Sequence, residues 1–168
     1  SETVEARRRT LGDEHPSTLT SISNLGALFC TQGKYTETEP LWREVLEAEL
    51  RMLGEEHPST LTTISNLGVL FYSQGKLNEA EPLYRKALEV RRRTLGDEHP
   101  STLQSINNLG LLLKRQGKLE EAEPLMREAV EAQRLALGDD RIALSAGRLA
   151  LSADRLALSP DHLSLSAD

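Results

Sequence analysis

The chain has 168 residues, of which 38% are hydrophobic and only 4% aromatic, and it carries a net charge of −6. So few aromatic residues favour stacked repeats, each burying a modest apolar face, over one deep core, and the acidic balance argues against a nucleic-acid partner. The single cysteine, Cys30, excludes an intramolecular disulfide and fits a reducing, cytoplasmic location, and no apolar run is long enough to insert into a membrane.

A unit of 42 residues occurs three times. It reads Asn-Leu-Gly, then Gln-Gly-Lys, then Glu-x-Glu-Pro-Leu, and its copies begin at Asn24, Asn66 and Asn108. A fixed period of this size indicates a solenoid, in which each repeat contacts only its neighbours. Apolar residues in each copy recur at helical spacing, so each repeat is predicted to be a pair of helices.

The repeats divide the chain into five segments. Residues 1–11 match the end of repeat two and are expected to be the end of a preceding repeat, truncated at its start. The three repeats are expected to cover residues 12–53, 54–95 and 96–138. Their first helices are predicted at 17–32, 59–74 and 101–116, and their second helices at 36–52, 78–94 and 120–137.

Residues 139–168 are expected to form a low-complexity tail of seven-residue units. The two leucines of each unit are two residues apart, so neither a helix nor a strand would give them a consistent buried face. Residues 142–151 are expected to serve as a partial capping helix, which solenoids usually need. A tail that mediates oligomerisation is the alternative.

The linker before each repeat reads Gly-Asp-Glu-His-Pro, with Glu in place of Asp at residue 55. Glycine ends the preceding helix and proline suits the first helical position. The repeated histidines are His15, His57 and His99. Because two helix layers separate successive copies, on the order of 20 Å, and zinc needs its ligand atoms at about 2 Å, we predict no metal site and assign the histidines to capping or loop packing.

Two further repeated features are interpreted structurally. Gly26, Gly68 and Gly110 lie inside predicted helices, where glycine costs roughly 1 kcal/mol against alanine, so a close approach between helices is expected at each. The arginine triplets 7–9 and 91–93 lie at predicted helix C-termini, where basic residues face the negative end of the dipole. We interpret them as solvated helix ends rather than as a phosphate-binding patch.

The spacing of these residues resembles that of the tetratricopeptide repeat. The resemblance is carried by eight places, counted from the leucine that opens each first helix (Leu19, Leu61 and Leu103): the fourth, seventh, eighth, eleventh, fifteenth, twentieth, twenty-fourth and twenty-seventh. They hold Ile22, Leu25, Gly26, Phe29, Gly33, Thr38, Trp42 and Val45; Ile64, Leu67, Gly68, Phe71, Gly75, Ala80, Tyr84 and Ala87; and Ile106, Leu109, Gly110, Leu113, Gly117, Ala122, Met126 and Ala129. The period of 42 residues is longer than the 34 that are usual for this repeat. This period and the Asn-Leu-Gly, Gln-Gly-Lys and Glu-Ala-Glu-Pro-Leu-Tyr motifs resemble the repeats of kinesin light chains, over residues 1–139. This resemblance implies an all-α fold, a right-handed α-solenoid of tetratricopeptide-type helical hairpins.

The resemblance also implies that the first helices line a concave groove holding an extended peptide. By position, the groove residues are Thr20, Ser23, Asn24, Ala27 and Cys30; Thr62, Ser65, Asn66, Val69 and Tyr72; and Gln104, Asn107, Asn108, Leu111 and Lys114, with Arg115 at the edge. Their amides and hydroxyls suit a peptide backbone, Tyr72 and Leu111 an apolar side chain, and Lys114 a carboxylate. The paired asparagines typical of kinesin light chains survive only as Asn107-Asn108. An alternative role for the single asparagines is hydrogen bonding between helices.

The implied partners are proteins or peptides, among them a kinesin-type motor complex and its cargo adaptors, and the implied location is at the cytoskeleton. Signalling proteins that join an NTPase to such arrays use similar repeats, so a regulatory array of a larger signalling NTPase is the alternative function. The sequence has no Gly-rich phosphate loop, metal-ligand spacing or nucleophile elbow. We therefore expect no enzyme activity, no cofactor and no metal.

Overall fold

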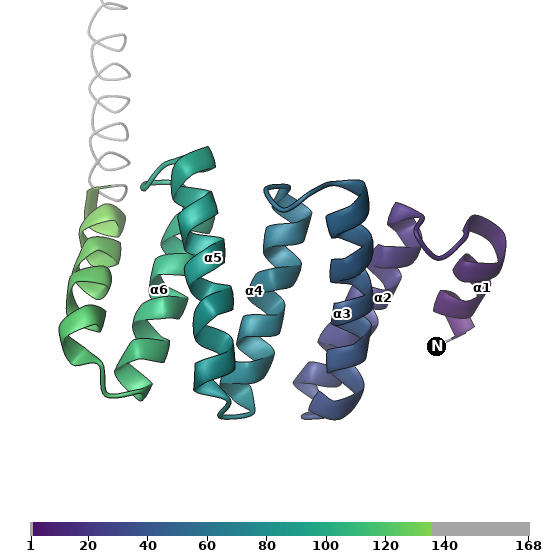
Figure 1. Cartoon of the computed structure of the whole chain (residues 1–168), viewed down its shortest axis with the longest axis horizontal. Helices are drawn as coiled ribbons and strands as arrows, with labels where there is room; N and C mark the ends of the chain where they lie inside the picture. The colour runs from purple at the N-terminus through teal and green to yellow at the C-terminus, as the bar shows by residue number, and fades with distance from the viewer. Residues whose placement is uncertain (1, 136–168) are drawn as a thin grey trace, which may run out of the picture. The chain divides into compact units, whose positions relative to one another are not determined.

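The computed structural model describes residues 2–135, and these form helices joined by short turns (Figure 1). The helices are α1 (Glu2–Leu11), α2 (Pro16–Thr31), α3 (Tyr35–Met52), α4 (Pro58–Ser73), α5 (Leu77–Leu95) and α6 (Pro100–Arg115), and residues 119–135 are also helical. The chain divides into two compact units, residues 1–129 and 130–168. The predicted tail, 139–168, and its capping segment lie outside the described residues, within which no helix is long and apolar enough to cross a membrane.

Each helix of the first unit packs on the next one in the sequence, from α1 through α6 (Figure 1). This serial packing is what a stack of helical hairpins requires, and the predicted pairs of helices are confirmed, with ends shifted by one residue or so. Helices α2, α4 and α6 are the first helices of the hairpins, and α3, α5 and the helical residues 119–129 are the second.

The linker histidines cap the helices that follow them. His15 precedes Pro16 at the start of α2, and its Nδ1 accepts a hydrogen bond from the Ser17 amide at 3.1 Å. His57 and His99 do the same for α4 and α6, at 3.2 and 3.1 Å. Each histidine thus satisfies an amide that has no partner inside its own helix, and the capping interpretation is correct.

The helical glycines mark where the two helices of a hairpin come closest. A Cβ added at Gly68 would lie 2.5 Å from Tyr84 Cε1, and one at Gly26 would lie 2.5 Å from Trp42 Nε1. Trp42 Nε1 also donates a hydrogen bond to the Ser23 carbonyl at 3.1 Å, across the same contact. The close approach predicted from the glycines is therefore present, and aromatic rings of the second helix occupy the space that a side chain would need.

The interpretation of the arginine triplets as solvated is wrong for their first members. Arg91 is only 5% exposed, and its Nη1 donates to Ser105 Oγ at 2.7 Å and to the Ser101 carbonyl at 3.3 Å. Arg7 Nη1 makes the equivalent bonds to the Ser17 carbonyl, at 2.9 Å, and to Ser21 Oγ. These guanidinium groups turn inward and join the second helix of one repeat to the first helix of the next, which periodicity in one helix does not reveal.

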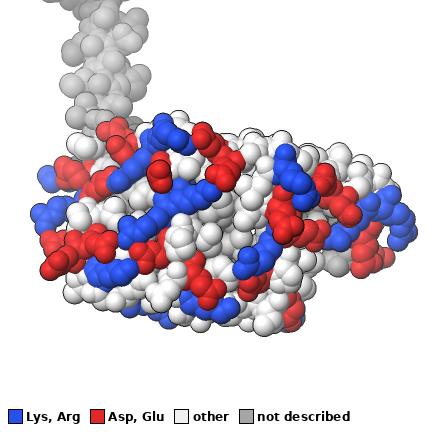
Figure 2. Space-filling model, in the orientation of Figure 1, with Lys and Arg blue, Asp and Glu red and all other residues white. Residues whose placement is uncertain are grey.

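Ion pairs between repeats add to these contacts on the surface. Arg92 Nη2 lies 2.6 Å from Glu128 Oε1, and Arg8 Nη2 lies 2.5 Å from Glu44 Oε1, in the equivalent place. Figure 2 shows basic and acidic side chains interleaved over the viewed face. Because these groups are partly exposed, each pair contributes little, typically less than about 1 kcal/mol.

Candidate functional site

The predicted groove residues lie on the faces of α2, α4 and α6 that are not buried in the hairpins. None of them is among the buried residues of the described part of the chain. The exposed ones are Thr20, Asn24, Ala27, Thr62, Val69, Gln104, Asn107, Leu111 and Lys114, with Arg115 at the edge, and the half-buried ones are Ser23, Cys30, Ser65, Asn66, Tyr72 and Asn108. The three helices therefore present hydroxyl, amide and aliphatic groups together.

Tyr72 and Arg115 meet near the C-terminal ends of α4 and α6. The Arg115 guanidinium lies 4.8 Å from the centre of the Tyr72 ring, and Nη1 donates to the Tyr72 carbonyl at 2.8 Å. A cation stacked on an aromatic face is held in place electrostatically. This contact holds Arg115, which was predicted at the edge of the groove, against Tyr72 of repeat two.

A cleft of about 380 Å³ opens between α2, α3 and α4. Four of the predicted groove residues line it, namely Thr20, Ser23, Asn24 and Thr62. The other predicted groove residues lie outside it. We call this the Glu49 cleft, after the one acidic residue in its lining; its remaining walls are Pro16, Leu19, Val45, Met52, Leu53, Pro58, Ser59 and Thr63.

Glu49 is a buried carboxylate in the wall of this cleft. It is 8% exposed, and its Oε2 atom has no hydrogen-bond partner among the described residues. Burial raises the pKa of the Glu49 carboxyl, and the nearby Thr63 hydroxyl and His57 offset only part of that rise. An unpaired buried acceptor is costly, about 1–3 kcal/mol, so this residue stands out as a candidate for binding a ligand group.

Glu49 is not among the residues predicted from the sequence, although the sequence carries a signal for it. Residues 7, 49 and 91 are equivalent places one period apart, and they read Arg, Glu and Arg. A reversal of charge at one place in a repeat would have pointed to the junction between repeats one and two. The charge reversal points to a binding group only if the position is buried, and the structure shows that Glu49 is buried.

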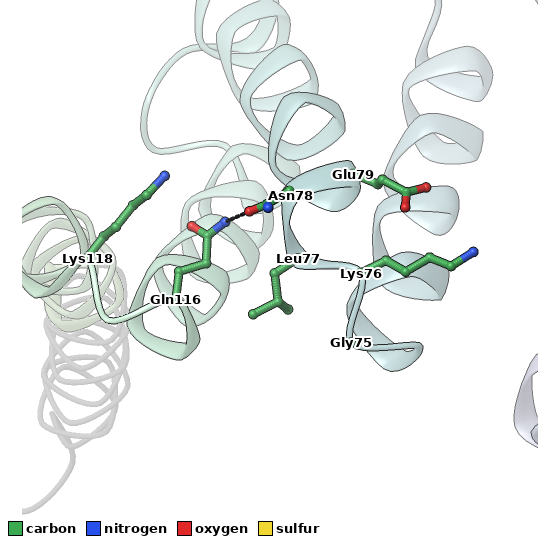
Figure 3. Close-up of a pocket in the computed structure, with 7 residues that line it drawn as sticks. All are labelled: Gly75, Lys76, Leu77, Asn78, Glu79, Gln116 and Lys118. Atoms are coloured by element: carbon green, nitrogen blue, oxygen red, sulfur yellow. Dashed lines mark hydrogen bonds between the residues drawn. The ribbon is translucent and has the colours of Figure 1, made fainter.

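A second hollow, of about 470 Å³, lies at the turns of repeats two and three (Figure 3). Gly75 and Lys76 come from the turn before α5, Leu77 is the first residue of α5, and Gln116 and Lys118 come from the turn after α6. Gln116 Nε2 donates to Asn78 Oδ1 at 3.3 Å, the bond drawn in Figure 3, and to Glu81 Oε2 at 3.0 Å. These polar groups already bind one another, so the hollow joins the two repeats and is not our candidate binding site.

Glu81 is the acceptor at the centre of these contacts, and it should make stability depend on pH. A hydrogen bond from Lys118, at 2.8 Å, is the main cause that lowers its pKa to about 2, with Gln116 and Arg85 adding to the effect against desolvation. A lowered pKa stabilises the fold above the ordinary glutamate pKa, and the stabilisation is lost as pH falls through the folded value. We expect Glu81→Gln to lower the free energy of unfolding at neutral pH by about 1–2 kcal/mol.

The measurement is urea denaturation of wild type and Glu81→Gln across pH. The difference between them should disappear as the pH falls from 4.5 to about 2. Glu79→Gln, an exposed neighbour on α5, is the matched control. A constant difference across this range would mean that the Glu81 carboxylate is not what the contacts stabilise.

Comparison with known proteins places the chain in a family. The sequence profile of the family described as tetratricopeptide repeat matches residues 20–93 and 64–135, which together cover more than half of the chain. The chain belongs to the tetratricopeptide repeat family. The all-α solenoid of helical hairpins expected from the sequence is thereby confirmed, and repeats of this family are a scaffold type that binds other proteins on extended surfaces.

Similar solved structures include two of a candidate kinesin light chain from Podosopora anserina, described as having nearly identical TPR-like repeats. Both are 29% identical to this tetratricopeptide repeat chain, with TM-scores of 0.70 and 0.68, and the matches cover 80% and 79% of this chain and 63% of each of theirs. BtubC (BKLC) of P. vanneervenii has a TM-score of 0.71 at 24% identity, covering 98% of this chain and 59% of its own, and shows the fold alone.

This tetratricopeptide repeat chain thus spans between 59% and 63% of the length of these solved structures. The resemblance to kinesin light chains that the sequence motifs indicated is confirmed at the level of the repeats and their fold. No curated protein matches the sequence. Among residues 2–135, no three or more His, Cys, Asp or Glu side chains gather in a group that could hold a metal ion.

Proposed function

We propose that this chain binds an extended peptide along α2, α4 and α6. The observation that carries the proposal is the unburied face of these three helices, where hydroxyl and amide groups alternate with Val69 and Leu111, two aliphatic side chains exposed to solvent. Polar groups on such a face can pair with a peptide backbone, and exposed aliphatic groups can bury its apolar side chains. The Glu49 cleft gives this face a concave part.

The likeness of the repeats to those of a candidate kinesin light chain supports a partner class. We propose that the peptide belongs to a cargo adaptor of a kinesin-type motor complex, and that the protein therefore works at the cytoskeleton. The chain acts by holding its partner rather than by chemistry, as a scaffold of this family does.

The experiment is selection from a random peptide library displayed on phage, followed by titration of the best peptide. Combined substitution of Gln104, Asn107 and Lys114 with alanine should weaken binding by about tenfold or more, while the circular dichroism spectrum and melting temperature stay unchanged because the side chains are exposed. Glu47→Ala with Glu89→Ala, exposed on α3 and α5, is the control. Selection of no peptide would contradict peptide binding, and unchanged affinity in the triple variant would contradict this placement of the groove.

A further inference from the structure

One position of the repeat lies at the junction where a second helix packs on the first helix of the next repeat. At two of the three junctions this position holds a cation, and at the third it does not. At the first and last of the three junctions, the residue concerned is arginine: Arg7 reaches from α1 to α2, and Arg91 reaches from α5 to α6. In both, one guanidinium nitrogen donates to a serine carbonyl near the start of the next helix and to a serine hydroxyl four residues further on. The chain itself thus shows that this space accepts a cation.

At the middle junction the arginine is replaced by Glu49. The counterparts of the two serines are Ser59 and Thr63, and both line the Glu49 cleft. The same space is therefore bordered by a backbone carbonyl, a hydroxyl and a carboxylate, all of which accept hydrogen bonds. Glu49 Oε2 is buried without a partner among the described residues, so the group that would satisfy it is a donor with a positive charge.

The walls of the cleft suit the stem of such a group. Met52 and Leu53 are exposed aliphatic side chains in its lining, and Pro16 and Pro58 add further apolar surface. Met52 stands where the other two copies have Thr10 and Thr94. Lysine and arginine bury their methylene stems on apolar surface and keep the charged head on a polar group. Aliphatic walls around the Glu49 carboxylate are therefore complementary to the apolar stem and charged head of a lysine or arginine side chain.

We propose that the Glu49 cleft receives a lysine or arginine side chain of the bound peptide, with its charged head on the Glu49 carboxylate. This inference rests on the proposed function, because the cleft shares Thr20, Ser23, Asn24 and Thr62 with the predicted groove. Under this proposal, the scaffold recognises a basic residue of the peptide at the junction between repeats one and two. A partner without one loses that contact.

The test is parallel selection of displayed random peptides on the full chain and on Glu49→Gln. Wild type should enrich peptides with lysine or arginine at one fixed place, and Glu49→Gln should lose the preference at that place alone. The best wild-type peptide is then titrated against its neutral counterpart, with norleucine for lysine or citrulline for arginine. Wild type should bind the neutral peptide about tenfold or more weakly, and Glu49→Gln should bind both peptides alike.

Two further variants separate this effect from misfolding. Glu47→Gln removes an exposed carboxylate from the same helix and should behave as wild type. Glu49→Arg fills the space as Arg7 and Arg91 do and should abolish discrimination between the two peptides without lowering the melting temperature. Peptides selected without a fixed basic residue, or equal discrimination by wild type and Glu49→Gln, would overturn the inference and leave peptide binding standing. No selected peptide at all would overturn both.

Discussion

Gly68→Ala is expected to lower the free energy of unfolding by about 2 kcal/mol. The added Cβ would lie 2.5 Å from Tyr84 Cε1 and 2.8 Å from Cδ1, closer than real Cβ atoms come to other atoms. Tyr84 is 3% exposed and its ring is rigid, so the two helices of the hairpin must separate to relieve the clash. Overpacking of this kind costs about 3 kcal/mol, which exceeds the roughly 1 kcal/mol that alanine gains over glycine in a helix.

Gly110→Ala is the matched control, since it makes the same change at the equivalent place. The nearest atom to its added Cβ is Met126 Cγ, at 3.0 Å, and methionine is unbranched and half-buried there. A flexible side chain can move aside, so the two effects nearly cancel and we expect stability within about 1 kcal/mol of wild type. Urea denaturation followed by circular dichroism measures both variants. An equal loss at residues 68 and 110 would contradict the ring contact as the cause.

This pair of predictions illustrates what the sequence could and could not supply. Glycine repeated at one place in a predicted helix indicated a close approach between helices, because glycine is otherwise unfavourable there. The helix ends were also predictable, since Gly, His and Pro at fixed offsets leave few alternatives. Which group fills the contact depends on how the helices pack, and the aromatic rings of Trp42 and Tyr84 were seen only in the structure.

The candidate site was predicted less completely, for a physical reason. The unburied faces of α2, α4 and α6 follow from helical periodicity, because the buried face of each helix is clear. Arg91 and Glu49, in contrast, belong to charged runs at helix ends, which are typical of solvated surface. Whether a charge turns inward is decided by the next repeat, and the structure shows that both side chains lie against it.

Glu49→Arg is expected to raise the free energy of unfolding by about 1–2 kcal/mol at neutral pH, an unusual result for a substitution that reverses a buried charge. It removes a carboxylate oxygen that is buried without a partner among the described residues. It also places a guanidinium where Arg91 binds a serine carbonyl and hydroxyl, here within reach of the Ser59 carbonyl and the Thr63 hydroxyl. Charge-assisted hydrogen bonds to such acceptors contribute about 1.5–3 kcal/mol.

The pH dependence of the free energy of unfolding separates the two contributions to this gain, namely removal of the carboxylate and addition of the guanidinium. Because burial raises the pKa of Glu49, its carboxylate destabilises the fold above the folded pKa, and this penalty vanishes below the unfolded one, where both states are protonated. Glu49→Gln, which removes the charge without adding a cation, should therefore exceed wild type in stability at neutral pH and equal it in acid. Glu49→Arg should stay above both. If Glu49→Arg unfolds more easily than Glu49→Gln at neutral pH, the middle junction does not accept a cation as its neighbours do, and a basic side chain from a partner would find no place there either.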